Sequence, residues 1–202
     1  VGSEMCIRDS LTSVFDSPSL KAACEMLTQG RIKLGSGELT NYTLIKEIID
    51  RGLYLILSTG MSSLAEVKDV LNFISFTLEH PKEQPTNERI SNYQFKQNIV
   101  NGRVGLLHCT SQYPTPISDI NLNNVRTLRK IFKGKVGLSD HSKGELAAIT
   151  GVGVGIDILE KHFTISRKMQ GPDHKASMEP KEFAQLVNSI RNAERALGIF
   201  GK

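Results

Sequence analysis

The sequence predicts an α/β protein built on a parallel sheet, and three observations lead to that prediction. Short apolar runs alternate with stretches of helical period along nearly the whole chain. Each run ends abruptly in polar residues, which is typical of strands buried on both faces of a parallel sheet. Apolar residues make up 39% and charged residues 23%, as in an ordinary globular chain.

Six apolar runs are expected to be strands, and helices are expected between them. The strands are predicted at residues 11–15, 31–36, 53–58, 103–109, 135–139 and 156–162. Helices are predicted from Ser17-Pro18 to Gly30, at 41–50, after the Ser63/Glu66 capping box, at 122–132, at 145–148, and along a stripe comprising Phe183, Leu186, Val187, Ile190 and Leu197.

This strict alternation gives six βα units with right-handed crossovers. Either an open doubly wound sheet or a closed (β/α)₈ barrel fits, although a barrel needs about 250 residues and eight units. Residues 79–102 are predicted to be a long surface insertion before the fourth strand. The run 151–155, Gly-Val-Gly-Val-Gly, precedes a strand and is therefore not a dinucleotide fingerprint.

Composition excludes several classes of protein. A net charge of +4 is too small and too scattered to indicate a nucleic-acid partner. No apolar run approaches the roughly 18 residues of a membrane span, and no secretory signal is recognisable. The cysteines, Cys6, Cys24 and Cys109, have no paired spacing, which favours a reducing, cytoplasmic compartment. Residues 1–10 have no periodicity and are interpreted as an extraneous segment, with the domain proper at 11–202.

Polar residues at the carboxyl ends of the strands are the candidates for function, because ligands of parallel α/β folds bind there. Ser36, Ser58 and Ser139 each follow an apolar strand. Small hydroxyls beside backbone N–H groups commonly hold phosphate or carboxylate. The alternative is that they are ordinary turn residues.

Two lysines lie inside otherwise apolar strands. An unpaired buried ammonium is too costly, so Lys33 and Lys161 must meet a partner. That partner is either an anionic ligand or a nearby carboxylate, Glu38 for the first and Glu160 for the second.

Two histidines end consecutive strands and lie 21 residues apart in the sequence, His141 and His162. Neighbouring parallel strands are about 4.8 Å apart, so both imidazoles can reach one ion. Two neutral nitrogen ligands completed by water suit a divalent transition metal such as Mn²⁺ or Zn²⁺. A pair of hydrogen-bonded structural histidines remains the alternative.

Five blocks together closely resemble the sialic acid synthase (N-acetylneuraminate synthase) family, from about Leu11 to Lys202. They begin with Lys-Leu-Gly-Ser-Gly-Glu at 33–38 and Leu-Ser-Thr-Gly-Met at 57–61. His-Cys-Thr-Ser-Gln-Tyr-Pro at 108–114, Ser-Asp-His at 139–141, and Glu-Lys-His-Phe-Thr at 160–164 with Gly-Pro-Asp-His at 171–174 complete the set. The resemblance implies a (β/α)₈ barrel, of which this chain would supply the third to eighth βα units. Two units before it, and a small antifreeze-like domain after it, would be absent.

The resemblance also implies a reaction. The family condenses phosphoenolpyruvate with an N-acyl hexosamine such as N-acetylmannosamine, giving a nine-carbon 2-keto sugar acid and phosphate. It works as a homodimer with Mn²⁺ or a similar ion, Mg²⁺ or Co²⁺. The alternatives are an inactive truncated fragment, which would fold poorly, or another metal-dependent barrel aldolase.

Matched position by position, the resemblance implies roles for eleven residues. His141 and His162 match the metal ligands and, with Glu38, the catalytic set. Lys33, Ser36, Ser58 and Ser139 match the phosphoenolpyruvate site, to which Ser13 is added. Tyr113 and Asp173 match the amino-sugar site, with Ser111 standing where the family commonly has asparagine. His108, where another branch has lysine, favours the sialic and legionaminic branches.

Overall fold

The structure is a computed structural model that describes residues 11–27 and 29–198. Six parallel strands are hydrogen-bonded in their order along the chain, which confirms the α/β prediction. The chain divides into two compact units, Val1–Gly105 and Leu106–Lys202, which are described separately below. The interpretation of residues 1–10 lies outside the described residues. Within those residues, no helix combines the length and apolarity of a bilayer-spanning segment.

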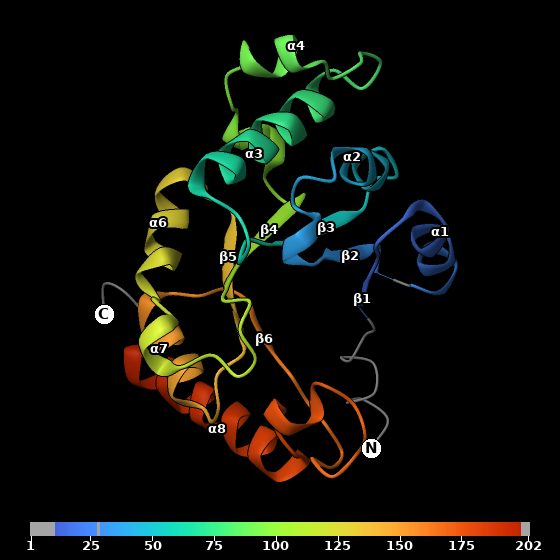
Figure 1. Cartoon of the computed structure of the whole chain (residues 1–202). Helices are drawn as coiled ribbons and strands as arrows, with labels where there is room; N and C mark the ends of the chain where they lie inside the picture. Colours follow the sequence, from blue (N-terminus) through green and yellow to red (C-terminus); the bar gives the residue numbers. More distant parts are fainter. Residues whose placement is uncertain (1–10, 28, 199–202) are drawn as a thin grey trace. The chain divides into compact units, whose positions relative to one another are not determined.

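The first compact unit is built on three short parallel strands with helices packed beside them (Figure 1). Strand β1 (Thr12–Ser13) pairs with β2 (Arg31–Leu34), which pairs with β3 (Tyr54–Ser58). The helices are α1 (Ser17–Met26), α2 (Tyr42–Asp50) and α3 (Leu64–Glu79), and η1 (Ser36–Glu38) is a 3₁₀ turn. Strand β3 is buried along nearly its whole length, as expected of a parallel strand.

Side-chain caps set where these helices begin. Asp16 caps α1 by accepting from the Ser19 amide at 2.7 Å, so the cap lies one residue before the predicted Ser17. The helix ends at Met26, short of the predicted Gly30. Ser63 and Glu66 form the predicted capping box of α3.

The insertion before β4 is more ordered than predicted. It contains two short helices, α4 (Asn87–Ser91) and α5 (Gln97–Val100). The Tyr93 ring meets the edge of Phe76 at 5.5 Å, and its hydroxyl donates to Glu79 at 2.7 Å. Lys96 forms an ion pair with the same carboxylate at 2.7 Å. These contacts hold the segment against α3. The polar composition of the segment gives no sign of them.

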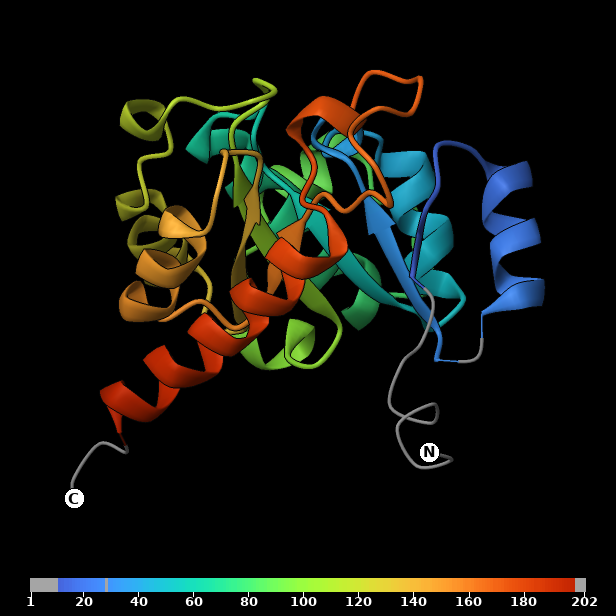
Figure 2. The ribbon, with the colours of Figure 1, turned by 90° about the horizontal axis from the view of Figure 1, so that it is seen from below.

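The second compact unit contains β5 (Lys135–Asp140) and β6 (Leu159–Lys161), while β4 (Val104–Cys109) spans the division between the units. Its helices are α6 (Asn123–Ile131), α7 (Leu146–Val154) and α8 (Pro180–Leu197), with 3₁₀ turns η2 (Ile117–Asp119) and η3 (His174–Ala176). Helices α7 and α8 lie side by side (Figure 2). They enclose a core of Ala148, Met178 and Leu186.

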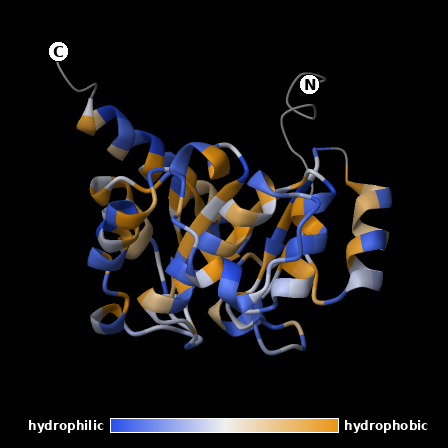
Figure 3. Cartoon of the chain, turned by 90° about the horizontal axis from the view of Figure 1, so that it is seen from above, coloured by the Kyte–Doolittle hydropathy of each residue, from blue (hydrophilic) through white to orange (hydrophobic). Residues whose placement is uncertain are grey.

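Helix α7 is longer than predicted, and the apolar stripe of α8 is less buried. Helix α7 continues through the glycine-rich run to a left-handed Gly155 at φ 86°, a C-terminal position that favours glycine. On α8, Leu186 is buried, but Val187 is 41% and Leu197 60% exposed. Figure 3 shows hydrophobic and hydrophilic residues mixed along this helix. Leu186 is therefore the one residue of the stripe that is fully buried.

Gly137 permits the close approach of β5 to the chain entering β6. A Cβ there would lie 2.2 Å from the Ile158 carbonyl oxygen and 2.8 Å from a Leu107 methyl group. We expect Gly137→Ala to lower the free energy of unfolding by about 1–3 kcal/mol, because backbone must move. Urea unfolding measures this. Gly153→Ala is the control: its Cβ would meet open space within α7, so the change should be neutral or stabilising by up to about 1 kcal/mol. Equal effects would contradict the prediction.

Buried His108 predicts acid sensitivity. Its Nε2 donates to the Ile120 carbonyl at 2.6 Å, and burial lowers its pKa below 6.5. Stability is therefore complete above about pH 6.5 and is lost as the pH falls from there through the lowered folded-state pKa, because the unfolded state binds the proton more readily. One such group contributes a slope of at most about 1.4 kcal/mol per pH unit. His108→Gln should make the pH dependence of urea unfolding shallower, and an unchanged dependence would contradict the prediction.

Candidate active site

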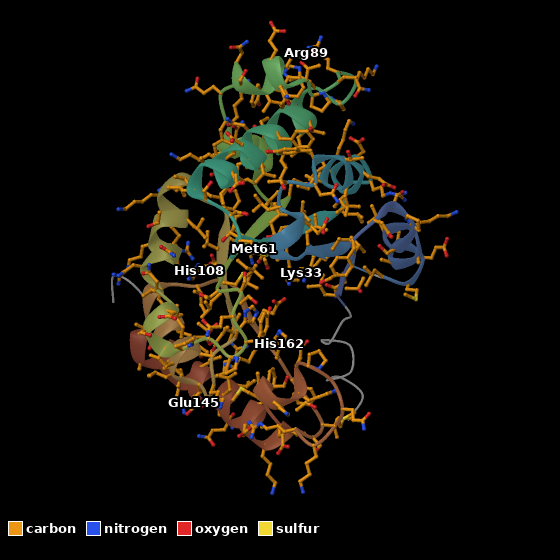
Figure 4. The ribbon with its side chains drawn as sticks, in the orientation of Figure 1. Lys33, Met61, Arg89, His108, Glu145 and His162 are labelled. Carbon is orange, nitrogen blue, oxygen red and sulfur yellow. The ribbon has the colours of Figure 1, made fainter. Side chains whose placement is uncertain are left out.

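The strand ends of the first compact unit carry four of the five residues matched to phosphoenolpyruvate. Ser13 and Lys33 are register partners on β1 and β2, so their side chains point to the same face of the sheet (Figure 4 labels Lys33). Ser36 lies in η1, where its hydroxyl accepts from the Gly60 amide at 3.2 Å. This contact ties the turn after β2 to the turn after β3.

Ser58 ends β3 in an unusual environment for a hydroxyl. It is 2% exposed, and its Oγ has no hydrogen-bond partner among the described residues. Buried polar groups nearly always have a partner, and an unsatisfied one costs about 1–3 kcal/mol. A ligand that reaches this strand end would supply the missing partner.

Glu38 is held in place by the helix that follows it. Its Oε2 accepts from the Asn41 side-chain amide at 2.8 Å. The same Asn41 caps α2 by accepting from the Leu44 amide at 3.2 Å. The orientation of the carboxylate therefore depends on the first turn of α2.

In the second compact unit, His141 has a defined tautomer. Its Nδ1 donates to the Thr110 carbonyl at 2.6 Å, which leaves Nε2 facing the Tyr113 hydroxyl at 3.1 Å. Burial lowers the pKa of His141, so the neutral ring is favoured. A neutral imidazole whose other nitrogen donates to a carbonyl is the usual arrangement of a metal-ligating histidine.

The rings of Tyr113, His141 and His162 form a cluster, and a carboxylate lies beside it. Tyr113 stacks on His141 with centroids 4.0 Å apart, and His162 meets His141 edge-on at 5.3 Å. The Nδ1 of His162, labelled in Figure 4, lies 4.0 Å from an Asp173 carboxylate oxygen. The structure therefore brings together the two residues matched to the metal and two of those matched to the sugar.

Ser139 contacts both His141 of this cluster and Glu160, a residue that was not among the predicted site residues. Its hydroxyl donates to Glu160 at 2.6 Å, and its Oγ lies 3.0 Å from His141 Nε2. Glu160 is the register partner of Ser139 on β6. Strand pairing, once known, would have identified it.

Two further predicted residues, Ser111 and Lys161, lie outside this cluster. Ser111 is exposed in the loop after β4, two residues before Tyr113. For Lys161, a carboxylate partner was one of two alternatives. That partner is Asp140, at 2.8 Å, and not Glu160, which points to the opposite face of β6.

The two imidazoles of His141 and His162 are nitrogen donors of the kind that divalent transition metals accept. Within the described residues, no three His, Cys, Asp or Glu side chains are arranged to hold a metal, so His141 and His162 would need ligands from solvent or substrate. Catalytic metal sites characteristically keep such open positions.

Comparison with known proteins is consistent across sequence and structure. The NeuB family model matches residues 5–202. An N,N'-diacetyllegionaminic acid synthase of Campylobacter jejuni is 39% identical over 82% of this chain and 44% of its own length. The human N-acetylneuraminate-9-phosphate synthase is 33% identical over 82% of this chain and 40% of its own length.

A solved N-acetylneuraminic acid synthetase of Leptospira borgpetersenii superposes with a TM-score of 0.76 at 32% identity, covering 94% of this chain and 58% of that one. The (β/α)₈ fold class is thereby confirmed, with six βα units among the described residues. The chain spans less than half the length of the two synthases matched by sequence. By the match over residues 5–202, the chain belongs to the NeuB family.

Proposed function

We propose that the full-length protein is a transferase that condenses phosphoenolpyruvate with an N-acyl hexosamine. The products would be phosphate and a nine-carbon 2-keto sugar acid. N-acetylmannosamine or a related 2,4-diacetamido sugar would give sialic or legionaminic acid. The relatives with 39% and 33% identity, named as legionaminic and N-acetylneuraminate-9-phosphate synthases, support this substrate class.

The observation that carries the proposal is the environment of His141. Its Nδ1 proton is donated to a backbone carbonyl, and its Nε2 lies 3.1 Å from the Tyr113 hydroxyl. The His162 ring meets the His141 ring edge-on, and Asp173 lies beside His162. Hydrogen-bonded structural histidines would not require a second imidazole and two potential sugar contacts at the same place. His141 and His162 would hold a divalent ion, most simply Mn²⁺, which would polarise the aldehyde oxygen of the sugar when bound.

The first compact unit supports the other half of the reaction. Lys33 and the unpartnered Ser58 hydroxyl offer a cation and a buried donor to an anionic substrate. Their role would be to orient phosphoenolpyruvate and to neutralise its charge, so much of the rate enhancement would come from positioning and electrostatics.

The chemistry assigns a distinct task to the carboxylate at the end of β2. Carbon 3 of phosphoenolpyruvate forms a bond to the aldehyde carbon, which leaves positive charge at carbon 2. Water adds there, and phosphate departs by C–O cleavage. Glu38, oriented by Asn41, would accept a proton from the adding water. We further propose that the full-length protein is a cytoplasmic homodimer.

His141→Ala is expected to weaken Mn²⁺ binding by more than the roughly 10–100-fold that changes to supporting groups cost, because a ligand itself is removed. Isothermal titration of the full-length protein measures the affinity. His80→Ala, at the end of α3 in the first unit, should bind as wild type does. Unchanged affinity in His141→Ala would remove this residue from the site.

Lys33→Met should raise KM for phosphoenolpyruvate far more than KM for the sugar. A hydrogen bond to a charged group contributes about 1.5–3 kcal/mol, so an increase of about 10–100-fold is expected. Steady-state kinetics with each substrate varied in turn measures both constants. Lys21→Met, an exposed lysine on α1, is the matched control. An equal rise in both constants would argue against an anion-binding role.

Ser58→Ala should separate stability from binding. Removing an unsatisfied buried hydroxyl is expected to stabilise the substrate-free protein by about 1 kcal/mol, while phosphoenolpyruvate binds more weakly. Ser75→Ala is the control in the same unit: Ser75 is equally buried but lies 3.0 Å from the Tyr93 hydroxyl and accepts from the Lys96 amide, so its loss should destabilise. Destabilisation by both changes, with unaltered binding, would contradict the assignment of Ser58.

A further inference from the structure

A buried ion pair is formed by the two residues that immediately precede His141 and His162 in the sequence. Lys161 Nζ is 2.8 Å from Asp140 Oδ2, and the two side chains are 2% and 0% exposed. Neither residue belongs to the cluster of rings, because each precedes a histidine in sequence and points to the opposite face of its strand.

The Asp140–Lys161 pair fixes the backbone on both sides of His141 through hydrogen bonds to Ser142. Asp140 Oδ1 accepts from both the amide and the hydroxyl of Ser142, at 2.9 and 2.7 Å. Lys161 Nζ also donates to the Ser142 carbonyl at 2.5 Å. The Lys161 ammonium thus contacts the residues before and after His141. Lys161 is also the residue that immediately precedes His162 in the chain.

Strand register depends on the same contact. Asp140 and Lys161 are register partners, as are Ser139 and Glu160 one step earlier. A register slip of one residue would place Asp140 and Lys161 on different faces of the sheet. Both charges would then be buried without a partner, which is strongly destabilising. The pair therefore opposes any displacement of one histidine relative to the other.

We propose that Asp140 and Lys161 are positioning residues, which set the separation of His141 and His162 and thereby the affinity of the site for a divalent ion. This deepens the proposed function and rests on it for the metal. The alignment of the two rings itself does not require that function.

The test replaces both charges at once, since one alone would remain buried and unpaired. In Asp140→Asn/Lys161→Met the asparagine oxygen can still accept from Ser142, but the link to β6 is lost. Isothermal titration of the full-length protein with Mn²⁺ should show affinity about 10–100-fold weaker, the range for groups that orient ligands. In metal-free, histidine-labelled protein, the NMR cross-relaxation between the two imidazoles should also be lost.

The matched control is Arg129→Met/Asp157→Asn, which removes a partly exposed ion pair of the same unit, 2.6 Å long. It should leave both readouts unchanged. A folded double variant with wild-type affinity and retained cross-relaxation would overturn the proposal. If the double variant does not fold, Asp140→Asn alone must shift both readouts in the same direction, and no shift overturns it. If the wild type binds no Mn²⁺, the metal role fails, and the cross-relaxation alone decides whether the pair positions the rings.

Discussion

The parallel pairing of β5 with β6 is the constraint on which the chemistry of the second unit depends. Because partners in register point to the same face, it aligns Ser139 with Glu160 and puts the buried Asp140–Lys161 pair on the other face. The two histidines follow immediately, one after each strand. Gly137 permits the close approach to Ile158 that this pairing needs. A structural feature that looks like ordinary sheet geometry thus determines which side chains meet.

Two polar groups at the strand ends contribute less to the stability of the fold than ordinary core residues would. Ser58 buries a hydroxyl without a partner, and burial lowers the pKa of His141. Each feature costs folding free energy. Each also places a polar atom at a strand end: the Ser58 hydroxyl without a partner, and the His141 Nε2, which lies 3.1 Å from the Tyr113 hydroxyl. Such local costs are characteristic of sites arranged for a ligand.

Much of the fold was predictable because local signals and burial agree. The six strands and the Ser63/Glu66 capping box follow from periodicity and helix-capping rules. The extent of α7 did not, because glycines disfavour helix, yet Gly151 sits where a Cβ would lie 3.0 Å from Ile156. Tertiary packing therefore selects the residue that local propensity disfavours.

The site was predictable as a set of strand-end residues but not as a network. Glu160, the carboxylate considered as a partner of Lys161, is its neighbour in sequence, whereas the actual partner Asp140 is its register partner on β5. Sequence distance along a strand does not reveal the face or the register. The hydrogen bond from Ser139 to Glu160 likewise requires the pairing of two strands 21 residues apart. The residue matches to the family supplied the candidates, and the strand pairing supplies their contacts.

The most direct measurement of the proposed reaction is phosphate release by the full-length protein with each component omitted in turn. Phosphate should appear in equal amount to a nine-carbon 2-keto acid, and only when phosphoenolpyruvate, an N-acyl hexosamine and a divalent ion are all present. Release of phosphate without the sugar, or formation of a carbon–carbon bond without release of phosphate, would contradict it.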